Sequence, residues 1–340
     1  MRIFHSLQEA QSYSNPSYSK ILSPSAFCLG TFDGIHAGHR VVMESALRFG
    51  QQHHLTTGVF TFSNHPQHVL TKTPPRLLST FDDRLATFEA MGFDMVVCPP
   101  FDDALKNIKA SLFIEDILKN TLNAKALSVG YDFCFGQNRQ GNGQFLQDNG
   151  PQYGIEHIHI IEPVKVHEQI VSSTLIRKLL TYGELEQAVH LLGYPYPLSA
   201  KVIQGKQLGR QLGFPTANLD MDTLKQQHRL IPANGVYGGY GQLNNKTYRI
   251  TVNIGHAPSV DGGTPTPRIE AHILDYNQSD FYGETLTIHL THQLRKEKTF
   301  DSLEALKTQI QADCDQARLL IPLPQQNINH PLNNVLTLSQ

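Results

Sequence analysis

Short apolar runs alternate with helix-length segments through the first half of the chain. Runs typical of buried strands lie at 26–29, 55–62, 95–98, 126–130 and 155–161. The spacing of apolar residues predicts a helix beginning near His39 and another over 79–91, capped by Ser79 and ended by Gly92. Alternation of strands and helices predicts an α/β fold, a doubly wound parallel sheet that binds ligands at the carboxyl ends of its strands.

The pattern changes after two short helices predicted at 173–182 and 184–192. We interpret the next five residues, 193–197, as a linker, because they are rich in Gly and Pro. Strand-like runs then follow at 198–204, 236–243, 248–254, 269–274 and 286–290. Their length, with Gly and Asn between them, predicts a small antiparallel β-barrel.

One helix is expected to close the barrel. Asp301 and Glu304 have capping-box spacing, and an apolar stripe follows at Leu303, Leu306, Ile310, Cys314 and Ala317. We therefore predict a first domain over 1–185 and a second over 186–321. The tail, 322–340, has three prolines and much Asn and Gln, so we expect it to be disordered.

Composition narrows the class of protein. A length of 340 residues with 40% hydrophobic content is enough for two cores. Lys and Arg (28) nearly balance Asp and Glu (30), which argues against a generic nucleic-acid partner. No apolar run approaches the roughly 20 residues of a spanning helix, and no apolar leader is seen, so no membrane partner is expected. Four dispersed cysteines predict free thiols and a cytoplasmic location.

The turn after the first strand carries candidate phosphate chemistry. Gly30, Gly34 and Gly38 are spaced by four and lead into a helix, whose N-terminal N–H groups favour an anion. His36 and His39 are three residues apart and should share one side of the first turn. Two such donors can neutralise charge on a phosphate undergoing displacement. Spacing alone is equally compatible with an ordinary Gly-rich turn and solvated histidines.

A second candidate phosphate element opens the helix at 173. Ser172 or Ser173 can cap this helix, while Thr174 and Arg177 share a face at i,i+3 spacing. Hydroxyl, N–H and guanidinium groups there could converge on one anion. The alternative is an ordinary capped helix with an exposed arginine.

The second half contains a Gly-rich loop and a strand carboxylate. If 216–218 is extended, Thr216 and Asn218 point to the same side and offer oxygen atoms suited to Mg²⁺. A Gly/Pro loop with a chance Thr/Asn pair is the alternative. Alternation of Ile269, Ala271 and Ile273 leaves Glu270 on the opposite face of its strand. A lone carboxylate there is more often a solvated charge.

Together these segments resemble a known family. The motifs at 30–39 and 172–177 are similar to the HxGH nucleotidylyltransferase superfamily. Segments 61–66 and 129–136, with Arg139 and Gly141, resemble the adenylyltransferase module of prokaryotic bifunctional riboflavin kinase/FAD synthetases. The likeness continues through 205–219, 234–237, 253–255, 268–275 and 294–303 in the kinase half. Such enzymes make FMN from riboflavin and ATP, then join the AMP of a second ATP to FMN and release pyrophosphate.

The resemblance implies a role for each matching residue. His36, His39 and Arg177 would act on the ATP phosphates in adenylyl transfer, and Glu270 would be the base of the kinase. The expected nucleotide and phosphate contacts are Gly30, Phe32, Gly34, Gly38, Asp132, Ser173, Thr174, Gly205, Lys206, Gly209, Arg210, Gly213 and Pro215. The expected flavin contacts are Phe62, His65 and Arg295, and Thr216 and Asn218 would bind Mg²⁺.

The expected substrates are therefore riboflavin, FMN and ATP, with Mg²⁺ in both steps. Ser259 replaces the threonine that the family usually carries, a change that keeps the hydroxyl. Three alternatives are a chain active in one half only, a different HxGH transferase, and a flavin-binding sensor that lost catalysis. A nucleic-acid-binding module is disfavoured, because the sequence has no basic stripe.

Overall fold

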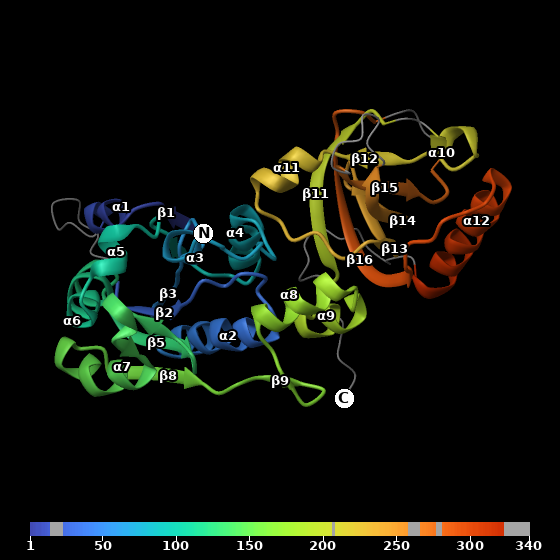
Figure 1. Cartoon of the computed structure of the whole chain (residues 1–340). Helices are drawn as coiled ribbons and strands as arrows, with labels where there is room; N and C mark the ends of the chain where they lie inside the picture. The colour runs from blue at the N-terminus through green and yellow to red at the C-terminus, as the bar shows by residue number, and fades with distance from the viewer. Residues whose placement is uncertain (14–22, 206–207, 258–265, 277–280, 323–340) are drawn as a thin grey trace. The chain divides into compact units, whose positions relative to one another are not determined.

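The computed structural model describes residues 1–13, 23–205, 208–257, 266–276 and 281–322 (Figure 1). Contacts divide the chain into two compact units. One contains Met1–Pro75 and Ser79–Ser172, and the other contains Arg76–Leu78 and the chain from Ser173 onward. Helices α8 (Ser173–Tyr182) and α9 (Leu185–Leu192) thus belong by contact to the second unit. The predicted domain limit at 185 stays a prediction.

The first unit is built on a parallel sheet, as predicted. Its six strands, taken from the described residues, have the order β1-β4-β3-β2-β5-β8. Their bounds are β1 Arg2–Phe4, β2 Ser25–Leu29, β3 Thr56–Phe60, β4 Met95–Val97, β5 Ala124–Gly130 and β8 His157–Ile161. The pattern missed β1, because a three-residue strand is too short to show a period, and it also missed the seven-residue helix α1 (Leu7–Tyr13).

Helices cover both faces of this sheet (Figure 1). On β2, Phe27 and Leu29 pack in a core with the π-helical segment η2 (Phe113–Thr121) and α7 (Gly143–Asn149). Between them, Cys28 packs in a second core with α2 (Ala37–Gln52) and α4 (Phe81–Ala90). The alternation of side chains along the strand produces this division. The shorter elements are α3 Gln67–Leu70, α5 Asp103–Asn107, α6 Ala110–Leu112, β6 Cys134–Phe135, η3 Gln137–Arg139, β7 Gly141–Asn142, η4 Gly150–Tyr153, β9 Lys165–Val166 and β10 Gln169–Ile170.

The strand order reverses at β2. The chain runs from β2 to β3 and β4 on one side, and then returns to β5 on the other side of β2. In open parallel sheets, ligands bind outside the carboxyl ends of the strands at such a reversal. The loops that follow β2 and β5 are therefore where a ligand is expected.

The second unit contains a closed antiparallel barrel, as predicted. The strand order is β11-β12-β15-β14-β13-β16. The bounds are β11 Tyr196–Ile203, β12 Ala217–Leu219, β13 Gly235–Leu243, β14 Lys246–Ala257, β15 Thr266–Ile273 and β16 Thr285–Arg295. The predicted linker at 193–197 is wrong. Gly193 ends α9 with a φ of +76°, and the fully buried Tyr196 already begins β11.

Two short helices, α10 (Leu208–Gln211) and α11 (Met221–Gln226), connect barrel strands along the sequence. Helix α12 (Leu303–Leu320) packs outside the barrel (Figure 1). Cys314 and Ala317 of α12 form a small core with Leu274. The predicted capping box of Asp301 and Glu304 is wrong, because Ser302 accepts the N–H of Ala305 at 3.1 Å. Leu303 is exposed, so the buried stripe begins later than predicted. Residues 323–340, most of the predicted tail, lie outside the described residues.

Candidate active sites

The turn from β2 into α2 is shaped by a close approach of Gly30 and Phe32. The Gly30 N–H donates at 3.1 Å to the carbonyl oxygen of Phe60, the last residue of β3. Phe32 has a φ of +54°, and a Cβ added to Gly30 would lie 2.8 Å from its ring. Only glycine therefore fits position 30 without moving Phe32.

His36 and His39 lie together at the first turn of α2, as their spacing predicts. The rings stack with centroids 3.6 Å apart and planes 17° apart. His36 caps the helix, since its Nδ1 accepts the N–H of His39 at 3.2 Å. A neutral His36 ring that accepts at Nδ1 carries its proton on Nε2, which is then a donor. The imidazole pair thus lies at a helix N-terminus, where an anion is favoured.

Asp33 holds this turn to the start of α4. The buried Asp33 carboxylate accepts the Ser79 N–H at 3.0 Å and its hydroxyl at 3.1 Å, and the Ser79 hydroxyl accepts the Gly34 N–H at 2.9 Å. Ser79 is therefore not the cap of α4, and that prediction is wrong. Thr80 is the cap, in a reciprocal capping box with Asp83.

Sequence reasoning missed Arg84 on α4. Its side chain is buried and donates to the Thr31 carbonyl oxygen at 2.8 Å, the Thr61 hydroxyl at 3.0 Å and the Phe62 carbonyl oxygen at 3.0 Å. Burial lowers the pKa of the Arg84 guanidinium, and the charge of Asp33 is the main opposing influence. No pattern along the chain separates this arginine from a solvated one, because its partners follow two different strands.

The predicted flavin contacts Phe62 and His65 follow β3, and the predicted nucleotide contact Asp132 follows β5. The Phe62 ring packs against Phe60 and Phe101, with centroids 5.6 and 5.1 Å away. His65 accepts the Gln67 N–H at Nδ1, at 3.2 Å. Asp132 is exposed just beyond β5. The ligand contacts proposed for these residues stay predictions.

Helix α8 begins at Ser173, as predicted from its sequence. Thr174 is exposed, and Arg177 donates from Nε to the Arg76 carbonyl oxygen at 2.8 Å. By contact these residues belong to the second unit, whereas His36 and His39 belong to the first. The convergence of both groups on one phosphate stays a prediction.

In the barrel, three polar side chains share one row. Asn218 of β12 and Asn253 of β14 both lie opposite Glu270 of β15. Residues directly opposite in antiparallel strands point to the same face. Ile269 and Ala271 are fully buried, so Glu270 points away from the barrel core, as predicted. Its Oε1 lies 3.3 Å from the Arg268 Nη1.

The Gly-rich loop approaches the β12 end of this row. A Cβ on Gly205 would overlap the Asn218 amide, and one on Gly209 would lie 3.3 Å from the Thr216 hydroxyl. Gly213 has a φ of +87°. Arg210 and Pro215 are exposed. Lys206 and Ser259 lie outside the described residues.

His272 holds the end of this loop. Its Nδ1 lies 2.8 Å from the Pro215 carbonyl oxygen, to which it donates, since a carbonyl is only an acceptor. Its ring also meets Phe214 edge-on, with centroids 5.6 Å apart. Burial lowers the pKa of His272, while the bond to Pro215 opposes this. The imidazole thus ties β15 to the residues that precede Thr216.

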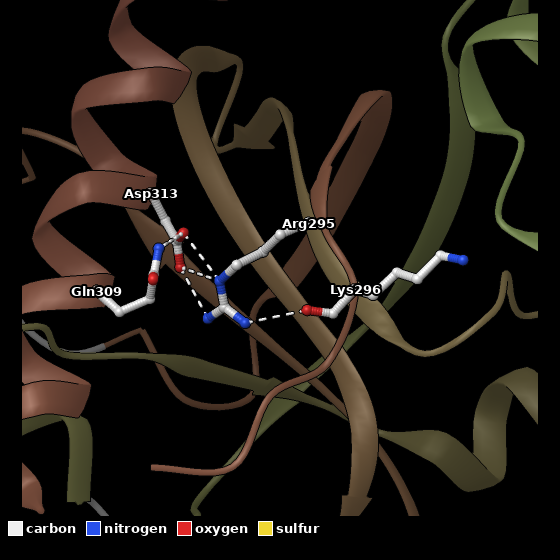
Figure 2. A network of polar contacts seen from close by, with 4 residues as sticks. All are labelled: Arg295, Lys296, Gln309 and Asp313. Atoms are coloured by element: carbon white, nitrogen blue, oxygen red, sulfur yellow. Dashed lines mark hydrogen bonds and ion pairs between the residues drawn. The ribbon is translucent and has the colours of Figure 1, made fainter.

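Arg295, a predicted flavin contact, ties the barrel to α12 (Figure 2). Its guanidinium donates to both oxygens of Asp313, with a shortest distance of 2.9 Å, and to the Lys296 carbonyl oxygen at 3.2 Å. Gln309 donates to the same carboxylate at 2.9 Å. The side chains of Arg295 and Asp313 are 14% and 5% exposed. A structural ion pair therefore engages Arg295, and its contact with flavin stays a prediction.

Comparison with known proteins agrees with two activities in one chain. A family model of FAD synthetase matches residues 19–175, and a model of riboflavin kinase matches 192–321. A bifunctional riboflavin kinase/FMN adenylyltransferase from Haemophilus influenzae is 33% identical over 306 residues, which cover 88% of this chain and 95% of that protein. The protein of that description from Escherichia coli K12 is 34% identical, over 84% of this chain and 89% of its own length.

A solved structure matches nearly the whole chain. A Streptococcus pneumoniae protein, described as a macrolide-efflux protein, has a TM-score of 0.80 and 28% identity, and the match covers 93% of this chain and 98% of that one. In the part of this chain that the structure describes, no helix has the length and apolar character needed to cross a membrane. The two family models and the long relatives agree with the motifs of both units. The chain belongs to the family of bifunctional riboflavin kinase/FMN adenylyltransferases.

Proposed function

We propose that this chain phosphorylates riboflavin to FMN in its barrel and adenylylates FMN to FAD in its first unit. One observation carries the proposal. The same chain holds an imidazole pair at the N-terminus of α2 and a Glu270–Asn218 pair on the barrel. Both lie in segments that match the corresponding family models.

In the kinase step, Glu270 is the base. It takes the proton of the terminal ribityl hydroxyl of riboflavin, whose oxygen attacks the γ-phosphorus of ATP, and ADP leaves. Glu270 suits this role because it lies outside the barrel core beside the two asparagines of its row. The close approach of Gly205 and Gly209 to Asn218 and Thr216 favours a loop that wraps the phosphates.

Thr216 and Asn218 are the proposed Mg²⁺ ligands. A hydroxyl and an amide oxygen are hard donors of the kind that Mg²⁺ takes, together with water and nucleotide phosphate. Among the described residues no group of three or more His, Cys, Asp or Glu side chains is placed to hold a metal ion. The ion would neutralise charge on the ATP phosphates.

In the adenylyl step, a phosphate oxygen of FMN attacks the α-phosphorus of ATP, and pyrophosphate leaves. His36 donates from Nε2, and His39 lies stacked beside it. The N–H groups of Gly30 and Gly34 donate to the Phe60 carbonyl oxygen and the Ser79 hydroxyl, so in this proposal these two glycines shape the turn, and phosphate binds at the N-terminus of α2 near Gly38. Ser173, Thr174 and Arg177 complete the phosphate site in this proposal, with Asp132 near the nucleotide.

The cytoplasm is the proposed location. All four cysteines are free in the structure, three of them buried, as suits a reducing compartment. The proposed ligands are small molecules, riboflavin, FMN and ATP.

Two separate assays test the function. With FMN and ATP, the chain should release pyrophosphate and FAD in equal amounts, and with riboflavin and ATP it should first form FMN. Activity in one assay only would identify a chain active in a single half. Bound flavin without product in either assay would identify a sensor and contradict the proposal.

A further inference from the structure

Arg84 is a buried cation that no step proposed above uses. Only 6% of the residue is exposed, and its guanidinium lies on α4, between the loops that follow β2 and β3. In the described part of the chain its three hydrogen bonds all go to these loops, and no carboxylate lies within ion-pair distance. Burial of a charge without an ion-pair partner is costly. Its place here therefore calls for an explanation beyond packing.

The contacts form a closed network. Nη1 donates to both the Thr31 carbonyl oxygen and the Thr61 hydroxyl, and the Thr61 hydroxyl itself donates to the Thr31 oxygen at 3.2 Å. Nη2 donates to the Phe62 carbonyl oxygen. The planar guanidinium thus spans the two loops with donors in fixed directions, which a point charge does not provide.

The two loops carry the residues proposed for the two substrates of adenylyl transfer. Thr31 lies between Gly30 and Phe32, two proposed nucleotide contacts, and Phe62 is a proposed flavin contact. Under the proposed function, the spacing of these loops would set the distance between the FMN phosphate and the α-phosphorus of ATP. A misplacement of about 1 Å between reacting groups can cost about 100-fold in rate.

We propose that Arg84 is a positioning residue for adenylyl transfer, which fixes the nucleotide loop relative to the flavin loop through Thr31, Thr61 and Phe62. This inference rests on the proposed function of the first unit. Arg84 acts through the loops and does not touch the reacting atoms. Its removal should therefore slow the chemical step more than it weakens binding.

The test compares Arg84→Lys with the wild-type chain in both assays. Lysine keeps the positive charge but lacks the planar set of N–H donors that spans the two loops. We therefore expect kcat for FAD formation to fall about 10- to 100-fold, with the KM for ATP changed less than about threefold. The riboflavin kinase kcat, measured in the same samples, should be unchanged. The exposed Arg48→Lys on α2 is the matched control and should leave both activities intact.

Thr61→Val gives an independent reading, because it removes the hydroxyl and leaves the arginine in place. We expect kcat for FAD formation to fall about tenfold, and the double variant to lose less than the product of the single losses, since both act on one network. If Arg84→Lys does not fold, the kcat of Thr61→Val for FAD formation is the deciding measurement. Full kcat in a folded Arg84→Lys or in Thr61→Val overturns the inference, as does an equal loss in both activities. A wild-type chain that forms no FAD overturns the proposed function and this inference together.

Discussion

Asn218 and Glu270 lie directly opposite each other on the antiparallel strands β12 and β15. This pairing places an amide and a carboxylate side by side on the outer face of the barrel, although they are 52 positions apart in the sequence. The proposed metal ligand and the proposed base of the kinase are thus neighbours. One strand register organises this candidate site.

Substitution of Glu270 should stop the first reaction only. In Glu270→Gln or Glu270→Ala, riboflavin loses its base, and a positioned base is worth about 10²- to 10⁴-fold in rate. FMN formation should fall by that factor, while FAD formation from supplied FMN should continue. Product assays on the purified variant measure both rates. A folded variant with equal losses in both would place Glu270 outside the kinase step.

Substitution of His36 separates its capping role from its chemistry. His36→Asn replaces the capping acceptor Nδ1 with a side-chain oxygen that can still cap α2, whereas His36→Ala loses the cap and about 1 kcal/mol of stability. Both should lower FAD formation by about 10²- to 10³-fold, the usual loss of one transition-state donor. Riboflavin phosphorylation should be unaffected, and His39→Ala should behave likewise. If His36→Asn makes FAD at the wild-type rate, the histidine is structural.

The ion pair of Arg295 and Asp313 should matter for stability. Asp313→Asn leaves a mostly buried guanidinium without its carboxylate, and loss of one partner of a buried pair costs about 3 to 5 kcal/mol. Denaturant unfolding of the full chain, followed at the transition of the second unit, measures the change in the free energy of unfolding. Lys225→Gln, which breaks an exposed pair with Asp222, is the control and should cost at most about 1 kcal/mol. A similar small cost for both would show that the ion pair of Arg295 and Asp313 contributes little to stability.

The lowered pKa of His272 predicts a pH dependence of stability. Its ordinary value is 6.5, and burial lowers it in the folded chain. Below that value the unfolded chain binds a proton that the folded chain does not, so the free energy of unfolding decreases as the pH falls from 6.5 toward the folded pKa. Above 6.5 this group has no effect. His272→Gln should flatten the decrease in denaturant titrations at a series of pH values.

His159 in the first unit has a pKa lowered by burial and by His157, and it should act in the same direction. The measurement is therefore the difference between His272→Gln and the wild-type chain. An unchanged slope below pH 6.5 in His272→Gln would contradict the assignment.

Local pattern predicted most of the regular structure. Helix α8 has the bounds expected from its apolar spacing. Strand β2 begins one residue before the expected 26–29, and all five of its residues are buried, as its apolar run predicts. Apolar periodicity did not predict short elements such as β12, whose three residues are too few to show a period. The segment 193–197 is interpreted as a linker because of its Gly and Pro content, yet its tyrosines at 194 and 196 are buried.

The wrong predictions at helix caps and in the candidate sites arose from contacts between residues that are far apart in the sequence. Ser79 and Thr80 are both good caps, and the choice between them depends on Asp33, which binds Ser79 from another part of the chain. Arg84 was missed for the same reason, since its partners belong to loops after two strands. Arg295 matches a family motif, but its ion pair with Asp313 depends on the docking of α12. Sequence patterns report local structure, and these contacts are long-range.

A complementation assay tests the division of labour most directly. Glu270→Gln and His39→Ala are incubated with riboflavin, ATP and Mg²⁺, first separately and then mixed, and riboflavin, FMN and FAD are separated by chromatography over time. We predict that Glu270→Gln leaves riboflavin unchanged, that His39→Ala stops at FMN, and that the mixture makes FAD. A mixture that makes no FAD while the wild-type chain does, or a wild-type chain that converts no riboflavin, would contradict the account.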